Sequence, residues 1–280
     1  MDQATVKSTA RDSALERIRG PAITVAMAGA SGHRLHIEGV LRPVIALHEG
    51  AMRGCAACYA VSETQPDGRV TPVLGTAMNA VDLERIDLAV LDRTFATIEP
   101  STAERPPLLI LPLSWSSLRN ASTRQRLLRL AAAGQLKLRN IALCEVIGIE
   151  PGTPQSALRE VTGRLQPIFR GVLARATPDR RTIRGLTDCG FTGATVEAAD
   201  LHDPEDEGAM LRTVLALQKI GSGVLVHAVR SVARLSTVRA AGASWASLEI
   251  VPGGKDAAGL AAHAKTAAGE TPTAASESSH

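Results

Sequence analysis

Apolar and polar positions along the chain form two kinds of segment that succeed one another for most of its length. Segments 35–47 and 53–62 are rich in β-branched residues and partly alternate between apolar and polar, which predicts β-strands. From residue 79 onward, segments with apolar residues at helical spacing alternate with short apolar runs, which predicts helices and buried strands in turn. Helices are expected at 79–98, 122–133, 155–165, 179–189, 205–220 and 232–241, and further strands at 108–113, 140–149, 169–174, 191–198, 223–227 and 245–251.

This order of elements predicts an α/β fold with eight strands. Continuous apolar strand segments are typical of a parallel sheet that is covered on both faces. Eight strands, most of them followed by a helix, over about 220 residues favour a TIM-type (β/α)8 barrel. An open, doubly wound α/β sheet is the alternative.

The two ends of the chain lack this pattern. Residues 1–34 are interpreted as a polar lead-in with a short helix around 13–19, and residues 35–251 as one barrel domain. Residues 252–280 are rich in Ala, Gly, Ser and Thr and have almost no large apolar side chains. Burial of such a segment offers little to offset the entropy lost on ordering, so we expect a disordered, low-complexity tail.

Composition narrows the classes of partner. Apolar residues make up 45% of the 280 residues but aromatic residues only 2%, so the core has to be built from Ala, Val, Leu and Ile. The net charge is +3, and the arginines are dispersed rather than gathered with aromatic residues, which argues against a nucleic-acid partner. No segment has the length and apolarity of a membrane span, and the charged N-terminus does not resemble a signal peptide. We therefore expect a cytoplasmic protein without membrane insertion.

Cys55 and Cys58 form a C-x-x-C motif, which in other settings binds zinc or carries out redox chemistry. Here the motif falls within a predicted strand, where residues three apart point to opposite faces. No second C-x-x-C follows. The pattern favours structural thiols over a metal or redox site.

Several segments, taken in order, carry a family resemblance. Residues 42–47, Arg-Pro-Val-Ile-Ala-Leu, are similar to a Q-P-I-v-d-L strand, and residues 145–148, Glu-Val-Ile-Gly, are similar to an E-i-t-E segment. Further matches are to a G-x-i-x-P turn at 68–72, an l-D-x-x-v-l helix at 86–92, a v-N-l-S strand at 111–114 and an A-E-G-V-E segment with its helix at 223–241. Together they resemble the EAL domain, the cyclic di-GMP phosphodiesterase family, over about residues 35–251.

The resemblance implies a modified barrel whose first strand runs antiparallel to the others. It also implies an active site at the carboxyl ends of the strands, where carboxylates hold two Mg²⁺ or Mn²⁺ ions that activate water. Two close cations require anionic oxygens to offset their charge. This sequence departs from the family at eight matched positions, which are Arg42, Ala56, Pro112, Gly148, Arg175, Glu197, His227 and Ser247.

At three of these positions the departure implies the loss of a metal-ligand side chain of the family. Ala56 matches the glutamate of the family's name motif, Pro112 matches an asparagine, and Gly148 matches the second glutamate of E-i-t-E. None of the three offers a side-chain oxygen. The comparison implies a degenerate site with no catalytic residues, no metal and no cofactor.

Two features suggest what the altered positions do instead. Arg42, Arg175 and His227 are expected at the same barrel mouth, where guanidinium groups and a titrating imidazole suit an anion. The alternative is that these changes followed the loss of catalysis and carry no new role. Trp115, just beyond a predicted strand end, is expected to be exposed and to anchor a protein interface, with packing over the barrel mouth as the alternative.

The function expected from the resemblance is regulatory. We expect a catalytically inactive EAL-like domain that acts as a regulatory or scaffolding module through protein partners in cyclic di-GMP-related signalling. The resemblance also implies a homodimer, because EAL domains commonly pair, and weak or no binding of cyclic di-GMP. The alternatives are a non-hydrolysing sensor that binds cyclic di-GMP or another anion, and an unrelated barrel enzyme.

Overall fold

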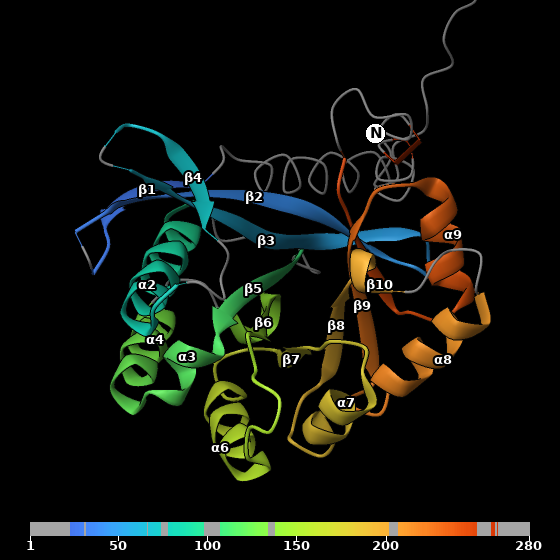
Figure 1. Cartoon of the computed structure of the whole chain (residues 1–280). Helices are drawn as coiled ribbons and strands as arrows, with labels where there is room; N and C mark the ends of the chain where they lie inside the picture. The colour runs from blue at the N-terminus through green and yellow to red at the C-terminus, as the bar shows by residue number, and fades with distance from the viewer. Residues whose placement is uncertain are drawn as a thin grey trace, which may run out of the picture.

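The structure is a computed structural model that describes residues 23–30, 32–65, 67–73, 78–97, 107–133, 138–201, 207–250, 259–260 and 262. Its described strands form one sheet in the order β1-β2-β10-β9-β8-β7-β6-β5-β3-β4, with an additional pairing of β2 and β3. That pairing closes eight of the strands into a barrel (Figure 1). The eight are β2 (Arg34–Ala46), β3 (Ala51–Thr64), β5 (Leu108–Ser114), β6 (Ala142–Ile147), β7 (Gly171–Arg175), β8 (Gly193–Glu197), β9 (Gly223–Val229) and β10 (Trp245–Leu248).

The directions of the strands confirm the predicted modified TIM-type barrel. The first barrel strand, β2, is antiparallel to both of its barrel neighbours, β3 and β10. The other pairings around the barrel, from β3 through β5 to β10, are parallel. Because the sheet closes on itself, the open doubly wound alternative is wrong.

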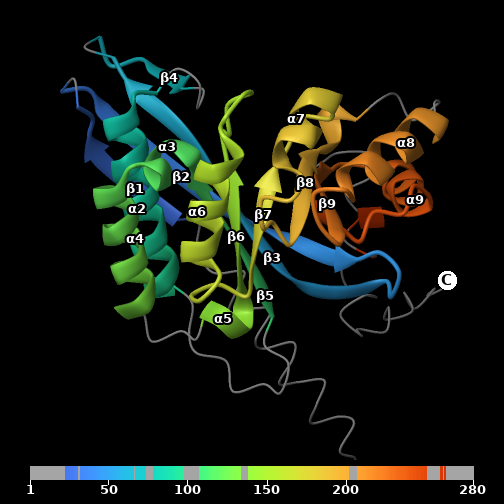
Figure 2. The ribbon, with the colours of Figure 1, turned by 90° about the horizontal axis from the view of Figure 1, so that it is seen from below.

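Helices cover the outside of the barrel between successive parallel strands (Figures 1 and 2). The described helices are α2 (Ala80–Thr97), α3 (Trp115–Arg119), α4 (Ala121–Ala133), α5 (Leu138–Ile141), α6 (Gln155–Leu165), α7 (Arg180–Leu186), α8 (Glu207–Leu217) and α9 (Val232–Ala240), with a 3₁₀ turn, η2, at Ala198–Asp200. Each of the six predicted helices has a counterpart among them. None of the described helices is long and apolar enough to cross a membrane.

The apolar residues are divided between two layers of the core. The larger layer lies between the strands and the helices and includes Leu111, Leu158 and Val226. The smaller layer fills the inside of the barrel with one buried residue from each of six strands: Val44, Ala56, Ile110, Leu143, Leu173 and Leu225. We refer to these six residues as the barrel floor. They close the barrel centre, so that any site has to lie at one of its ends.

Strands β2 and β3 are longer than the others and continue past the barrel, where β1 (Ile23–Ala28) and β4 (Val70–Val73) pair along their outer sides. Helix α2 covers one face of this extension, as Figure 1 shows, through a separate apolar cluster that includes Ile37, Val61 and Ile86. The sequence analysis predicted neither β1, within the expected lead-in, nor β4, which it interpreted as a turn.

The predicted terminal segments are described only in part. The helix expected at 13–19 lies outside the described residues, as does most of the tail expected at 252–280. Within that tail, however, Leu260 is buried and belongs to the larger core layer. The composition of the tail had predicted no packed side chain there.

Candidate functional site at the barrel mouth

A polar layer lies directly above the barrel floor, at the carboxyl ends of the parallel strands. Side chains two positions apart on a strand point to the same face. Glu145 comes two positions after the floor residue Leu143 on β6, and His227 comes two positions after Leu225 on β9. Both side chains therefore point to the inside of the barrel, as the floor residues do. Since β2 runs in the opposite direction, Arg42 precedes its floor residue and reaches the same end. We call this polar layer the barrel mouth.

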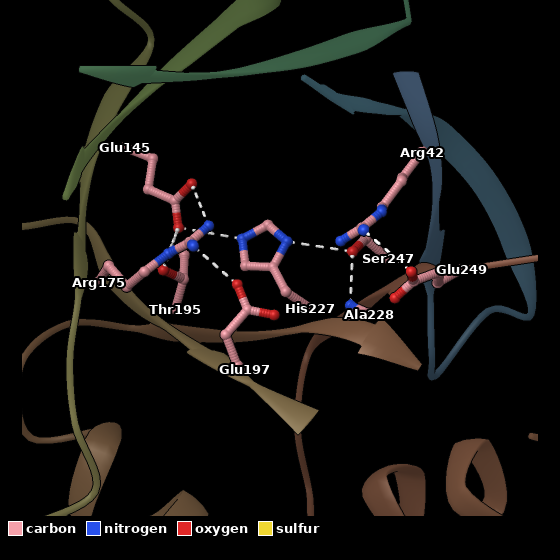
Figure 3. A network of polar contacts seen from close by, with 9 residues as sticks. All are labelled: Arg42, Glu145, Arg175, Thr195, Glu197, His227, Ala228, Ser247 and Glu249. Carbon is pink, nitrogen blue, oxygen red and sulfur yellow. Dashed lines mark hydrogen bonds and ion pairs between the residues drawn. The ribbon is translucent and has the colours of Figure 1, made fainter. Parts of the chain in front are cut away.

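The carboxylate of Glu145 contacts Arg175 and His227 in the mouth (Figure 3). Its side chain is only 1% exposed, and three neighbouring strands place donors around it. Its Oε1 accepts hydrogen bonds from Arg175 Nε at 2.9 Å and from the Thr195 hydroxyl, and contacts His227 Nε2 at 3.0 Å. Its Oε2 accepts from Arg175 Nη2 at 3.0 Å. Both carboxylate oxygens are therefore engaged.

Arg175, at the end of β7, links two carboxylates from different strands. It binds Glu145 with two nitrogens in the bidentate geometry that favours a guanidinium over an ammonium group. Its third nitrogen, Nη1, donates to Glu197 Oε1 at 2.7 Å. The side chains of Arg175 and Glu197 are 30% and 31% exposed, so this part of the network meets solvent.

His227 continues the network to the last strand. Its Nδ1 lies 3.0 Å from the Ser247 hydroxyl, which accepts a hydrogen bond from Ala228 N at 3.2 Å. An ionised carboxylate can only accept, so His227 Nε2 is the donor towards Glu145. Ala228 has φ +56°, a left-handed conformation that is costly for a residue with a Cβ. The backbone at Ala228 is therefore strained at the point where it holds Ser247 against the imidazole.

The charge state of Glu145 follows from these contacts. Burial alone would raise the pKa of its carboxyl group, but the interactions and hydrogen bonds with His227 and Arg175 outweigh burial and hold that pKa well below the usual range. Glu145 is thus a buried anion that the protein itself neutralises.

In the outer part of the mouth, two arginines hold the carboxylate of Glu249. Arg42 Nη2 lies 3.2 Å from Glu249 Oε1, and Arg230 binds both oxygens of the same carboxylate at 3.0 and 3.2 Å. The ion pairs of the mouth thus involve three arginines and three glutamates, which are Arg42, Arg175, Arg230, Glu145, Glu197 and Glu249. The charges of these six side chains sum to zero.

The residues singled out from the sequence are only partly brought together. Arg175, Glu197, His227 and Ser247 belong to one hydrogen-bonded network, whereas Arg42 is joined to Glu249. The three predicted anion-binding residues face the same mouth in Figure 3, but each has a carboxylate partner. Anion binding by them stays a prediction.

The three positions matched from the sequence to metal ligands of the family, Ala56, Pro112 and Gly148, lie in or next to the barrel. Ala56 is a floor residue opposite Arg42, and Pro112 is opposite Glu145 in the register of β5 and β6. Gly148 follows β6 in a left-handed conformation, φ +72°.

From the sequence, Glu145 was matched to the first glutamate of E-i-t-E but was given no role, and Thr195 was not considered, although the mouth is organised around these two residues. A signal was present for one of them. Glu145 is the only charged residue of the strand Ala142–Ile147, and a lone carboxylate inside an apolar run indicates a buried ion pair. Thr195 carried no such signal, because threonine is common in strands.

Trp115 corrects another expectation. It is the first residue of α3, which is capped by the Ser114 side chain, and the indole is only 4% exposed within the larger core layer. The expectation of an exposed tryptophan is wrong, because the chain turns into a helix directly after β5. The alternative was packing over the barrel mouth, whereas the structure shows the indole buried in the larger core layer.

A second buried carboxylate lies outside the barrel. Asp87 of α2 is fully buried and accepts hydrogen bonds from the Ser114 backbone N–H at 3.0 Å, from the Ser114 hydroxyl and from the Tyr59 hydroxyl at 3.5 Å. Burial raises the pKa of Asp87 to about 6, although these hydrogen bonds oppose the rise. Asp87 connects α2 to the start of α3.

The two thiols of the C-x-x-C motif lie on strand β3. Cys55 and Cys58 are not joined in a disulfide, and burial raises the pKa of the Cys58 thiol to about 11. The Cys58 thiol stays protonated near neutral pH, which makes it a poor nucleophile and a poor metal ligand.

Comparison with known proteins places this fold. No protein-family model matches the sequence, and no curated protein matches it. Among solved structures, the MucR phosphodiesterase in complex with cyclic di-GMP has 12% identity and a TM-score of 0.58, and the match covers 86% of this chain and 94% of that one. The FimX EAL domain from Pseudomonas aeruginosa bound to cyclic di-GMP has 16% identity and a TM-score of 0.55, with 86% and 93% covered.

A third solved structure, the S helix-GGDEF-EAL part of LapD from Vibrio cholerae bound to cyclic di-GMP, has 9% identity and a TM-score of 0.58. The match covers 88% of this chain, which spans little more than half, 56%, of the LapD chain. Together these structures show the class of fold. The chain has the barrel of EAL domains, with the antiparallel first strand that the sequence resemblance implied.

Proposed function

We propose that this protein is a non-hydrolysing EAL-like barrel that acts as a regulatory or scaffolding module in cyclic di-GMP-related signalling. In this proposal it is a cytoplasmic homodimer that works through protein partners. The observation that carries the proposal is the internal neutralisation of the barrel mouth. Its buried carboxylate, Glu145, is held by Arg175 and His227, and Glu197 and Glu249 are each held by an arginine. A mouth that has already paired its charges offers little to a metal or a phosphate.

The two metal ions that the fold family implies do not fit these residues. Such ions need several anionic oxygens that face one open position. In the part of the chain that the structure describes, no three His, Cys, Asp or Glu side chains are grouped so as to hold a metal ion. At the positions matched to family ligands, Ala56, Pro112 and Gly148 supply no oxygen from a side chain. We therefore derive no hydrolytic step.

A non-hydrolysing sensor is the second candidate, and one observation favours it. Arg42 and Arg175 keep 22% and 30% of their side chains exposed, so a phosphate could approach both. To bind there, however, it has to compete with Glu249, Glu145 and Glu197 for the same nitrogens. We expect cyclic di-GMP to bind with a dissociation constant above about 10 μM, or about −7 kcal/mol.

Two measurements on the purified protein test this proposal. The first is hydrolysis of cyclic di-GMP with Mg²⁺ or Mn²⁺, for which we expect no turnover. Turnover that a chelator abolishes and either metal restores would refute the proposal. The second is calorimetry with cyclic di-GMP. Saturable binding at low micromolar concentration or tighter, lost in Arg42→Ala, would favour the sensor.

The protein-contact part of the proposal needs its own experiment. An affinity pull-down from the native cell, with and without cyclic di-GMP, is expected to retain the same specific protein in both conditions. The mass in solution, measured by light scattering, is expected to be that of two chains. A monomer that retains no specific protein would contradict the scaffold.

A further inference from the structure

Helix α8 carries large apolar side chains on its outer face as well as on the face that packs against the barrel. Met210, Val214 and Leu217 are fully buried on the inner face. Leu211 and Leu215, one turn apart on the outer face, are 42% and 50% exposed. The other exposed large apolar side chains among the described residues lie on β2, β4 and α2 and after β10: Val40, Val70, Val81 and Ile250. Isolated apolar residues are common on protein surfaces, so the pair on α8 is the feature that needs an explanation.

Positively charged side chains lie beside this pair. Arg212 is exposed on α8, and Lys219 is exposed just beyond its end. Helix α7, which lies next to α8 (Figures 1 and 2), adds three exposed arginines. Two exposed acids, Asp179 and Asp188, flank α7, one at each end. None of the five cations takes part in an ion pair between described residues: Arg180, Arg181, Arg184, Arg212 and Lys219.

A contact between α8 and the end of α9 fixes the direction of these side chains. Gln218 Nε2 donates a hydrogen bond to the Gly242 backbone oxygen, just beyond α9, at 3.2 Å. Gln218 continues the helical hydrogen bonds of α8, since its N–H donates to Val214 O, and it lies seven positions after Leu211 on the same side of the helix. That side faces α9. Arg212, about 100° further round the helix, therefore leans towards α7 and its arginines.

We call Leu211, Leu215 and the five cations the α7–α8 surface. We propose that this surface binds an amphipathic helix of a partner protein, with apolar side chains along one face and acidic side chains beside them. Two leucines four positions apart form a short apolar seam of the kind along which helices pack, and charged residues beside such a seam select a partner of opposite charge. Five cations therefore favour acidic residues on the partner. The inference rests on the proposed function, because it names the contact surface and the kind of partner of the regulatory module.

Two other occupants fit this surface less well. A second copy of this chain, bound about a two-fold axis, would bring Arg212 and Lys219 towards the same cations of the other copy. The contact of a homodimer is therefore expected elsewhere. A lipid surface needs a broad apolar face that enters the headgroup region. The α7–α8 surface offers two leucines, and about half of each is already packed against the protein.

The test uses a probe of defined chemistry. It is a synthetic helical peptide of about 20 residues, about 30 Å long, with leucines along one face and glutamates beside them. A second peptide has lysines in place of the glutamates. Leu215→Ser removes one side chain of the apolar pair, and Arg212→Glu combined with Lys219→Glu reverses the charge beside it. Val81→Ser is the matched control, because Val81 on α2 is 49% exposed, nearly the same as Leu215.

Binding is measured by the fluorescence anisotropy of the labelled peptides at low and at high salt. We expect the natural protein to bind the glutamate peptide saturably, and at least about tenfold more tightly than the lysine peptide. Leu215→Ser is expected to weaken this binding at least about fivefold, Val81→Ser to leave it unchanged, and added salt to weaken it. The charge-reversed protein is expected to prefer the lysine peptide.

Four outcomes would overturn the inference. They are equal affinity of the natural protein for both peptides, an equal loss of affinity in Val81→Ser, binding to phosphatidylserine vesicles but to neither peptide, and self-association that Leu215→Ser abolishes. The substituted side chains are exposed, so we expect unchanged thermal midpoints. If Leu215→Ser does not fold, the preference of the charge-reversed protein between the two peptides decides the test.

The pull-down from the native cell separates this inference from the proposed function. If the natural and the charge-reversed proteins retain the same specific protein equally well, that partner binds elsewhere, so the inference fails and the scaffold stands. If the natural protein retains no specific protein, the proposed function fails and the inference fails with it. Retention that is lost only in the charge-reversed protein, together with the expected peptide preferences, supports both.

Discussion

Asp87 allows a quantitative test of the structure through pH. The substitution Asp87→Asn keeps the shape of the side chain and removes its ionisation. An asparagine oxygen can accept from Ser114, as the Asp87 Oδ2 does, while its NH₂ group can donate to the Tyr59 hydroxyl, which lies 3.5 Å from Oδ1. The variant is therefore expected to keep the contacts between α2, β3 and the start of α3.

The magnitude follows from the raised pKa. Burial raises the pKa of Asp87 from 3.8 to about 6. A shift of about two pKa units corresponds to about 3 kcal/mol. Because the folded state prefers the protonated acid, this contribution to stability is fully present below the unfolded pKa and is lost as the pH rises through the folded pKa. Asparagine does not titrate and shows no such loss.

The assay is urea denaturation of the natural protein and of Asp87→Asn at several values of pH. We expect the free energy of unfolding of the natural protein, minus that of the variant, to fall by about 3 kcal/mol between about pH 4 and about pH 7. Taking the difference cancels the titration of other groups, such as Glu145. A difference that stays constant with pH would refute the buried, partly protonated carboxyl that the structure describes.

Two further substitutions test the barrel mouth. Glu145→Gln leaves Arg175 and His227 without their buried anion, and we expect a loss of about 3–5 kcal/mol in the free energy of unfolding by urea at neutral pH. The loss is expected to shrink as the pH falls through the usual range of a carboxyl group and below it. The pKa of Glu145 is lowered in the folded protein, so its contribution to stability is greatest at a pH where the carboxyl group is ionised in both the folded and the unfolded state. A loss under about 1 kcal/mol at neutral pH would contradict the network. Ala228→Gly removes the Cβ that makes the left-handed φ of +56° costly, so we expect the free energy of unfolding to rise by about 1 kcal/mol and the thermal midpoint to rise with it. A lower midpoint would show that this strain is absent.

The barrel itself was predictable because its signals are local. Each buried strand is a short apolar run and each covering helix has apolar residues at helical spacing, so the eight barrel strands and six helices follow from the residues between turns. The strands that were missed have weaker signals. Strand β1 has two alanines among its six residues, which blur the contrast between its faces, and β4 is a four-residue exposed strand that contains Pro72.

The candidate site was predictable in its location but not in its pairings. Alternation along a strand places Arg175, Glu197 and His227 at the carboxyl ends of the barrel strands. It does not reveal that Glu145 binds Arg175, 30 positions away, and His227, 82 positions away. Which side chain meets which depends on the closure of the barrel and on side-chain lengths. The positions of two arginines and a histidine thus suggested an anion site, while their carboxylate partners could be seen only in three dimensions.

The pairings also bear on what the mouth does for the protein. Through Glu145, Arg175, Thr195 and His227 the network joins β6, β7, β8 and β9, and through Ser247 it reaches β10. It therefore connects five successive strands at the end of the barrel where TIM-type enzymes place their catalytic residues. Polar residues in an active site commonly reduce stability, because they are arranged for a ligand rather than for one another. Here the residues of the same layer bind one another, which makes the mouth part of the structural framework of the barrel.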